Sequence, residues 1–208
     1  MITEPRLPHL QNFSNLNNFF RTNDILKDVS IFDEIVECVD IDEIEFHSCS
    51  LKKINFINCN LNKSYFFNIV FENVDLSNIN LEKSTFKRVI FKNCKLIGTY
   101  FSSSYFENVT FTECNMKNIV LDSSSLTKVA INSSILTEGL LSNLILKEVY
   151  FFNSNLTLVD FSNTSLKNID LSTSITDGIT IYAKDIVGVT LNKSQALDFV
   201  KLLGINIL

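Results

Sequence analysis

Five cysteines and two histidines are the side chains of this 208-residue sequence with the widest scope for nucleophilic or metal chemistry. Cys94 and Cys114 lie 20 residues apart, and two thiolates brought together would supply half of a tetrahedral zinc site. No histidine lies near them in the sequence, and no second pair completes the set. Because small apolar thiols are common core residues, we expect Cys94 and Cys114, like Cys49 and Cys59, to fill the interior.

Nucleophilic catalysis requires a base beside the nucleophile, and the two histidines suggest no such pairing. His9 lies in an irregular N-terminal segment, and His47 is expected to point outward. The sequence contains neither a glycine-rich phosphate loop nor a His-Glu-x-x-His metal motif. We therefore predict that the protein is not an enzyme and needs no metal or cofactor.

The composition predicts a folded, acidic protein. The chain is 46% hydrophobic and 20% charged, with a formal net charge of -5. Its 18 Lys and Arg residues are few for a protein that neutralises phosphates, so direct nucleic-acid binding is not expected. The first residues lack the pattern of a secretory signal, no apolar run approaches a membrane span, and five cysteines do not suit a disulfide framework. These features favour a cytoplasmic protein.

The sequence repeats with a period of five residues. Every residue whose number ends in 1 or 6 is apolar from Ile31 to Leu171, a total of 29 positions, and 11 of the 18 Phe residues occupy them. A second, more compact column lies two residues earlier and holds small or β-branched residues. Asn is frequent two residues after the large position, where its tolerance of unusual backbone angles suits a tight corner.

A period of five fits neither a strand nor a helix, but it fits a short extended edge followed by a turn. Repetition of that unit coils the chain into a solenoid. The runs Cys59-Asn60-Leu61-Asn62-Lys63 and Ser154-Asn155-Leu156 resemble the unit of pentapeptide-repeat proteins. The resemblance implies an all-β solenoid, a right-handed four-sided parallel β-helix with 20 residues per coil. The core residues expected in it include Phe46, Phe66, Phe86 and Phe106.

Segments outside the repeat are expected to close the ends of the solenoid. We divide the chain into an N-terminal lid (1–28), a repeat β-helix (29–192) and a C-terminal helix with a tail (193–208). In the lid, Leu16, Phe19 and Phe20 have the spacing of one face of a short helix. In the C-terminal segment, Ser194 is a suitable N-cap and Gly204 a suitable stop.

The C-terminal helix carries more apolar surface than one coil end can cover. One face would cap the last coil, and the excess favours a homodimer through the helix, with a deep cap in a monomer as the alternative. The residues expected at the dimer interface are Ala196, Phe199, Val200, Leu202 and Leu203.

Two places depart from the repeat. Glu34 stands at a compact inward position, which predicts an irregular first coil. Gly139 and Leu144 put a missing and an oversized side chain at neighbouring compact positions, which predicts a local distortion.

Positions 20 residues apart share one face of a four-sided coil, and one face gathers acidic residues. These are Asp40, Asp42, Glu43, Glu82, Asp122 and Asp160, accompanied by the bases Lys63 and Lys83. The face is either an acidic stripe for a partner or an ordinary solvated surface. A second face carries an outward line that either stabilises stacked strands or forms a docking strip. Its members are Val70, Ile90, Thr110, Ala130 and Tyr150.

The stretch Leu191-Asn192-Lys193-Ser194-Gln195-Ala196 through Leu203-Gly204-Ile205 is similar to the ending of Qnr-type quinolone-resistance proteins. That resemblance implies a helix that joins two rods and a non-enzymatic DNA mimic that binds type II topoisomerases, DNA gyrase or topoisomerase IV, and modulates quinolone sensitivity. Many Qnr-type members carry loops, and this chain has none between residues 39 and 171, which favours binding or inhibition over drug protection. The alternative is a structural scaffold with an unrelated partner.

Overall fold

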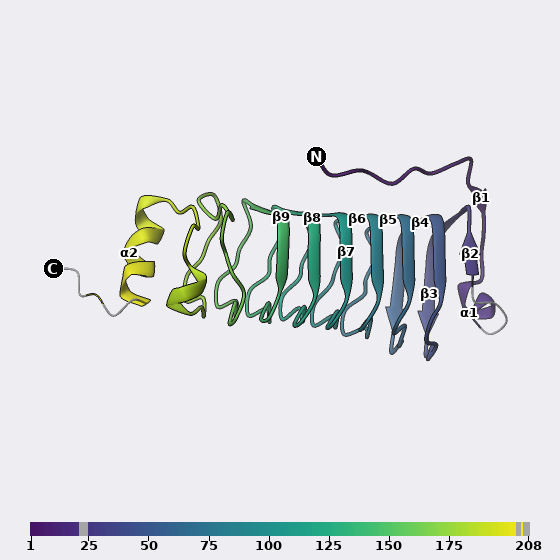
Figure 1. Ribbon diagram of the computed structural model, residues 1–208. Helices are drawn as coiled ribbons and strands as arrows, with labels where there is room; N and C mark the ends of the chain where they lie inside the picture. Colours follow the sequence, from purple (N-terminus) through teal and green to yellow (C-terminus); the bar gives the residue numbers. More distant parts are fainter. Residues whose placement is uncertain (21–24, 203–204, 206–208) are drawn as a thin grey trace.

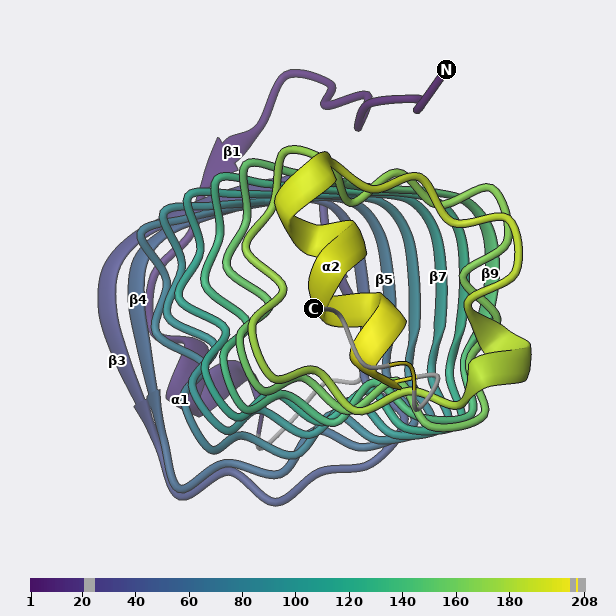
Figure 2. The same cartoon turned by 90° about the vertical axis from the view of Figure 1, so that its left-hand side faces the viewer.

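The computed structural model describes residues 1–20, 25–202 and 205, and for Leu202 the backbone alone. The chain winds into a straight rod of stacked coils with α1 and α2 at opposite ends (Figure 1). Seen along the axis, the coils superimpose as a four-sided outline (Figure 2). The elements are β1 (Gln11–Asn12), α1 (Leu16–Phe19), β2 (Ile25–Lys27), β3 (Val29–Glu37), β4 (Glu45–Ile57), β5 (Tyr65–Glu72), β6 (Thr85–Lys92), β7 (Tyr105–Thr112), β8 (Ser125–Asn132), β9 (Ile145–Phe152), the 3-10 helix η1 (Ala183–Asp185) and α2 (Lys193–Leu202).

Parallel pairing between successive coils builds the rod. Strands β3 to β9 pair in sequence order, and each residue lies opposite the residue 20 positions later, as in Phe46↔Phe66. Strands β5 to β9 each run through one corner and so belong to two faces, while single bridges such as Asn60↔Asn80 continue the ladder on the other two. The rod has about seven turns, and the predicted parallel β-helix with 20-residue coils is confirmed.

A residue with left-handed backbone makes each corner. Every residue whose number ends in 3 or 8 has a positive φ from Asp28 to Asn168, for example 56° at both Asn68 and Asn108. Asn reaches this region more readily than most residues because its short side chain bonds to nearby backbone groups. The frequent Asn of the repeat therefore follows from the geometry of the corners.

Aromatic side chains stack in columns along the core. The rings of Phe66, Phe86 and Phe106 lie parallel with centroids 4.7 and 4.8 Å apart, and Phe46 continues the column 5.0 Å from Phe66. All four are buried, as the repeat predicts for large inward positions. The next face repeats the spacing at Phe71, Phe91 and Phe111. The ring spacing equals the distance between hydrogen-bonded strands, so the register of the coils produces the stacking.

Hydroxyl side chains at compact positions complete the hydrogen bonding of the interior. The Ser104 hydroxyl accepts a hydrogen bond from the Ser84 N–H at 3.0 Å and donates one to the Leu81 carbonyl at 3.1 Å. One coil later, the Ser124 hydroxyl accepts from the Ser104 N–H and donates to the Phe101 carbonyl. A buried backbone group without a partner destabilises the fold, and these hydroxyls remove that penalty at successive coils.

The distortion predicted at Gly139 and Leu144 affects side chains and leaves the register intact, because β8 and β9 pair residue for residue. Leu144 is buried, whereas Leu146, at the neighbouring large inward position, is half-buried. A Cβ at Gly139 would lie 2.9 Å from the Leu136 carbonyl oxygen, so lack of space explains the glycine.

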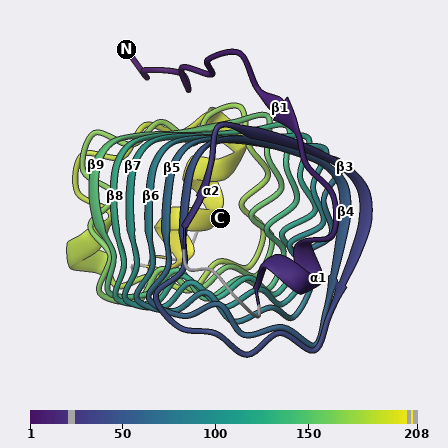
Figure 3. The ribbon, with the colours of Figure 1, turned by 90° about the vertical axis from the view of Figure 1, so that its right-hand side faces the viewer.

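The lid lies over the first coil. Figure 3, viewed from this end, shows α1 against the open end of the rod. Leu16, Phe19 and Phe20 are buried there, as their helical spacing predicts. Glu34 does not enter the core: its carboxylate accepts hydrogen bonds from the N–H groups of Asn15 and Leu16 at 2.7 and 2.8 Å. The irregular first coil therefore holds the start of α1 in place.

Helix α2 lies across the other end of the rod (Figure 2). Phe199 is 4% exposed and belongs to the core cluster. The Gln195 side-chain amide donates to the carbonyls of Leu171 and Ser174 at 2.8 and 2.7 Å. One helix face thus covers the apolar core. The same face donates hydrogen bonds to backbone carbonyls that, at the end of the rod, have no next coil to donate to them.

The N-cap prediction at Ser194 is wrong, because α2 already includes Lys193. The Asn192 side chain accepts from the Gln195 N–H at 3.0 Å, and the Gln195 side chain accepts from the Asn192 N–H at 2.8 Å. This reciprocal pair is a capping box, in which two N–H groups at the helix start find partners. The stop predicted at Gly204 lies outside the described residues.

Candidate interaction surfaces

One side of the rod carries all six acidic residues singled out in the sequence, and we name it the acidic face. Its acids are Asp40, Asp42, Glu43, Glu82, Asp122 and Asp160. Asp40 and Asp160 belong to one ladder of bridges, six coils apart. Glu82 and Asp122 lie 40 residues apart, and two coils correspond to about 10 Å along the rod.

Contacts within the chain already occupy the acids near the N-terminal end of this face. Lys63 Nζ lies 2.8 Å from a carboxylate oxygen of Asp42 and 4.0 Å from one of Glu43. The Asn60 side chain donates to Asp40 at 2.7 Å. Such exposed pairs add little stability. The positive charge of Lys63 does lower the net negative charge that this end of the face presents to a partner.

Asp122, at the middle of the face, is held in one orientation. Its carboxylate accepts hydrogen bonds from the Ser142 hydroxyl at 2.6 Å, the Asn143 amide at 2.8 Å and the Ser123 hydroxyl at 2.9 Å. These bonds stabilise the charged form and lower the pKa of Asp122 below its ordinary value. The face therefore presents an ionised, fixed carboxylate here.

An apolar ladder interrupts the acids at the centre of the same face, and the sequence analysis missed it. Tyr100, Val120 and Leu140 lie in direct bridge register. Tyr100 is 46% exposed, Leu140 is 37% exposed, and Val120 is half-buried. The sequence did contain a signal for this ladder, because the three residues follow at intervals of 20 in the column that begins at Asp40. An apolar centre surrounded by polar and charged residues is the layout of a protein–protein interface.

The second predicted line of residues also lies in register, along strands β5 to β9, and we name it the strand ladder. Its members are Val70, Ile90, Thr110, Ala130 and Tyr150. Tyr150 is 53% exposed, as is Phe152 two residues later. The first four are half-buried by their neighbours, which fits a role in strand stacking, while the two aromatic rings extend into solvent.

Residues 1–10 form an extended segment, here named the strap, that runs back along the outside of the rod (Figure 1). The Thr3 N–H donates to the Asn108 side chain at 3.0 Å, and the Arg6 N–H donates to the Asn68 side chain at 3.3 Å. Asn108 lies 105 residues after Thr3, and Asn68 lies 62 residues after Arg6. The five-residue period therefore gave no signal that the strap would bind here.

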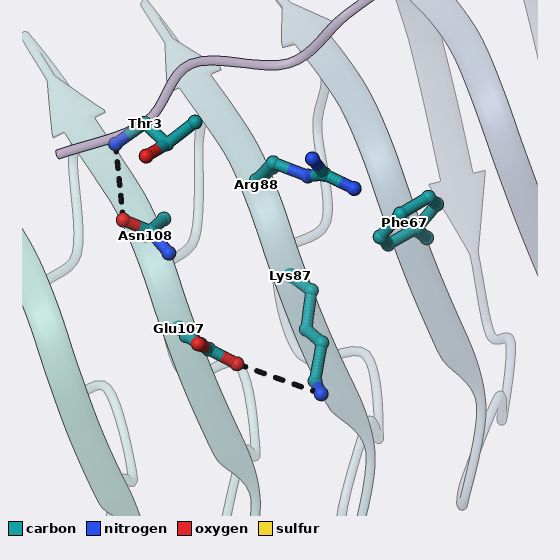
Figure 4. Close-up of a pocket in the computed structure, with 6 residues that line it drawn as sticks. All are labelled: Thr3, Phe67, Lys87, Arg88, Glu107 and Asn108. Atoms are coloured by element: carbon teal, nitrogen blue, oxygen red, sulfur yellow. Dashed lines mark hydrogen bonds and ion pairs between the residues drawn. The ribbon is translucent and has the colours of Figure 1, made fainter.

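A cavity of about 210 Å³ opens beside the strap, above strands β5 to β7 (Figure 4). The Arg88 guanidinium lies 4.3 Å from the centroid of the Phe67 ring, and Lys87 Nζ lies 3.5 Å from a carboxylate oxygen of Glu107. The lining residues are Thr3, Phe67, Lys87, Arg88, Glu107 and Asn108. The cavity thus offers a cation over an aromatic ring, beside an ion pair.

Of the side chains considered for chemistry, Cys94 and Cys114 meet in the core, where their side chains hydrogen-bond to each other. Cys49, Cys59, Cys94 and Cys114 are buried, and burial raises the pKa of the Cys49 thiol to about 11, which keeps it protonated. His47 Nε2 lies 2.7 Å from a carboxylate oxygen of Glu45. Within residues 1–20, 25–202 and 205, no group of three His, Cys, Asp or Glu side chains is placed to hold a metal ion. No helix in those ranges has the length and apolarity to cross a membrane.

The residues predicted at the dimer interface divide between two sides of α2. Phe199 covers the last coil of its own chain, so its assignment to a dimer contact is corrected to a capping role. Ala196 is exposed and Val200 is half-buried on the helix surface. Leu197, which the sequence analysis did not include, is 52% exposed. The two remaining predicted contacts, the Leu202 side chain and Leu203, lie outside the described residues.

A regular solenoid with capped ends and flat outer faces defines a class of rod-shaped repeat proteins. The model for a pentapeptide repeat region matches residues 84–151, and the model for pentapeptide repeats (8 copies) matches residues 49–88 and 64–102. The chain is a pentapeptide-repeat protein. At the level of sequence, no curated protein matches it.

Among solved structures, the fold is similar to that of trypsin-treated QnrB1, a plasmid-mediated fluoroquinolone resistance protein, with 18% identity, a TM-score of 0.56 and coverage of 99% of both chains. It is also similar to HetL, a pentapeptide-repeat protein involved in heterocyst differentiation regulation in the cyanobacterium Nostoc sp. strain PCC 7120. That match has 11% identity, a TM-score of 0.50 and coverage of 81% of this chain and 90% of the other. At such identities these similarities concern the fold.

Proposed function

We propose that the protein is a non-enzymatic, cytoplasmic binding protein that engages a type II topoisomerase, DNA gyrase or topoisomerase IV, through its acidic face. The observation that carries the proposal is this face, on which six acidic residues surround an apolar ladder along one side of a straight rod. Similarity in fold to a fluoroquinolone resistance protein over nearly the whole chain supports the choice of partner, because the Qnr-type resemblance implies topoisomerase binding.

Charge density limits how far the rod can act as a DNA mimic. Asp40 and Asp160 are six coils apart, which is about 29 Å at the spacing of paired strands. Duplex DNA carries one charge per about 1.7 Å, or about 17 over that length. Six acids, two of them in contact with Lys63, fall well below this number. Electrostatic attraction alone is therefore too weak, and we assign part of the affinity to Tyr100, Val120 and Leu140.

The rigidity of the rod favours binding. Coils in fixed register present Asp122 and the apolar ladder in one arrangement before contact, so little ordering entropy is lost. The acids steer a basic partner surface toward the face, and this attraction weakens as salt increases.

A gyrase supercoiling assay tests the proposal. We expect the wild-type protein to inhibit supercoiling. Glu82→Gln/Asp160→Asn should need about five times more protein for half-inhibition, since two half-buried surface charges contribute about 0.5 kcal/mol each. The matched control is Glu113→Gln/Glu148→Gln, which removes two exposed acids away from the acidic face. Equal inhibition by both double variants would contradict a role for this face.

The strand ladder supports a second candidate, a scaffold with an unrelated partner, because Tyr150 and Phe152 are exposed on a regular strand surface. In this case Ile90→Lys should abolish capture of that partner and leave gyrase unaffected. Capture that is unchanged by Ile90→Lys and lost in Glu82→Gln/Asp160→Asn would reject the scaffold.

We also propose a homodimer through the outer side of α2, centred on Leu197, Ala196 and Val200. Exposed apolar residues on a terminal helix that already caps its own coil are suited to a two-fold contact. Such a dimer would double the length of the acidic face offered to a topoisomerase.

A further inference from the structure

The strap and one corner of the rod match in hydrogen-bonding groups. Thr3 and Arg6 donate main-chain N–H groups to the side chains of Asn108 and Asn68. Both acceptors stand at corner positions with φ of 56°, which hold their side chains on the outside of the coil. The contacts use the main chain of the strap, so they do not depend on its side-chain identities.

The spacing of the donors also matches the spacing of the coils. Phe66, Phe86 and Phe106 belong to successive coils, and their ring centroids lie 4.7 and 4.8 Å apart, so two coils advance about 9.5 Å. Three residues of extended chain advance about 10 Å. An extended peptide along this corner therefore comes back into register with the rod every third residue.

The residues between the two hydrogen bonds are complementary as well. Pro5, directly before the second donor, has no N–H, and Arg88, the corner residue of the intervening coil, has no acceptor on its side chain. Ile2, Pro5 and Leu7 are half-buried against the rod. The corner therefore accepts main-chain donors at two coils and apolar side chains beside them.

The strap fills its site incompletely. The cavity of about 210 Å³ lies beside Thr3, whose short side chain leaves it open (Figure 4). Arg88 and Lys87 line this cavity. A longer acidic side chain at the position of Thr3 would bring a carboxylate toward the Arg88 guanidinium, where a charge-assisted hydrogen bond forms.

We propose that this corner is a docking site for an extended segment of a partner protein, and that the strap occupies it as an internal competitor. The partner segment offers N–H donors three residues apart, apolar side chains next to them and an acidic residue at the position of Thr3. The mode differs from the addition of a strand to a sheet edge, because side-chain amides of the rod accept the main-chain hydrogen bonds.

The test uses the full-length chain with Thr3→Pro/Arg6→Pro, which removes both donors from the strap. The probe is a fluorescein-labelled peptide of residues 1–10 that carries Thr3→Glu, titrated to about 1 mM and followed by fluorescence anisotropy. We expect it to bind the double variant at least ten times more tightly than wild type, whose own strap competes. The same peptide with Arg6→Pro should not bind.

Corner variants provide matched controls on the rod. In the double-variant background, Asn108→Gly should weaken peptide binding at least fivefold, whereas Asn118→Gly should leave it unchanged. Both positions have φ of 56°, which Gly adopts without strain. Circular dichroism of each variant should match that of wild type.

Four results would overturn the proposal. Equal affinity of the peptide for wild type and for the double variant, or no binding to either, would remove the corner as a docking site. Rapid amide hydrogen exchange at Thr3 and Arg6 in wild type would show that the strap does not occupy it. A wild-type dimer that the double variant dissociates would assign the corner to the strap of a second copy.

Discussion

Replacement of Phe86 by Ala is expected to destabilise the rod more than any exposed aromatic substitution. Phe86 is 0% exposed, stacks on Phe66 and Phe106 at 4.7 and 4.8 Å, and meets Phe101 edge-on at 5.3 Å. Loss of a buried Phe costs about 3–5 kcal/mol in cavity and transfer terms. Because two stacked neighbours also lose a partner, we expect a loss near the upper end, about 4–5 kcal/mol.

Phe86→Leu separates the ring contacts from the volume. Leu retains most of the buried apolar surface and loses two stacked pairs, each of about 0.5–1.5 kcal/mol, so we expect a loss of about 1–3 kcal/mol. The assay is guanidinium unfolding followed by far-ultraviolet circular dichroism, with the midpoint compared at constant slope. Phe152→Ala is the matched control, since Phe152 is 53% exposed and should change stability by less than about 1 kcal/mol. A loss in Phe86→Leu no larger than in Phe152→Ala would refute stacking as a source of stability.

Three further predictions concern the interior, the acidic face and α2. Ser104→Ala removes the acceptor of the Ser84 N–H and should destabilise the protein by about 1–3 kcal/mol in the same unfolding assay. A change under about 0.5 kcal/mol would contradict the role of this hydroxyl in satisfying the buried N–H. Ser142→Ala removes a hydrogen bond to the Asp122 carboxylate and should raise the pKa of Asp122 in an NMR titration. Folding lowers the pKa of Asp122, so the hydrogen bonds to its carboxylate stabilise the protein at pH values above the pKa of the unfolded chain, and this stabilisation disappears as pH falls through the pKa of the folded protein. Wild type and Ser142→Ala should therefore differ in stability at about pH 7 and converge in acid. A difference in stability that is constant with pH would contradict this. Leu197→Asp should convert a dimer of 23.7 kDa chains to monomer in light scattering, and a monomeric wild type at high concentration would reject the dimer.

The architecture was predictable because one rule, repeated, determines it. An apolar residue at every fifth position fixes which side chains point inward, and the 20-residue coil then puts Phe66 over Phe46 and Phe86 over Phe66. Hydrogen-bond register and side-chain size agree at each coil, so no competing arrangement satisfies both. The frequent Asn at corners follows from the same geometry.

The ends and the strap were less predictable because their contacts depend on neighbours that the repeat does not specify. The sequence analysis assigned Gln195 no role in the cap, because only the position of the Leu171 and Ser174 carbonyls makes it part of the cap. Phe199 is buried against the last coil of its own chain, and the repeat pattern does not specify this contact either. The strap has no pentad pattern, and its partner Asn108 differs in no visible way from other corner residues.

The candidate site was predictable in part. Grouping positions 20 residues apart identified the acidic residues on one face. The sequence did not show that Lys63 contacts Asp42 and Glu43. The apolar ladder at Tyr100 was overlooked because the count followed charge and ignored apolar residues in the same column. Predicting which side chains pair on a solenoid surface therefore requires the register between coils as well as the spacing of residues in the sequence.

Binding of purified DNA gyrase to the immobilised protein, measured over a salt series from about 50 to 200 mM, tests the central claim most directly. The account predicts that affinity falls as salt rises, that Glu82→Gln/Asp160→Asn weakens binding and flattens the salt dependence, and that Tyr100→Ser weakens binding equally at every salt concentration. Absence of binding, or binding that neither variant changes, would contradict the assignment of the acidic face to a topoisomerase partner.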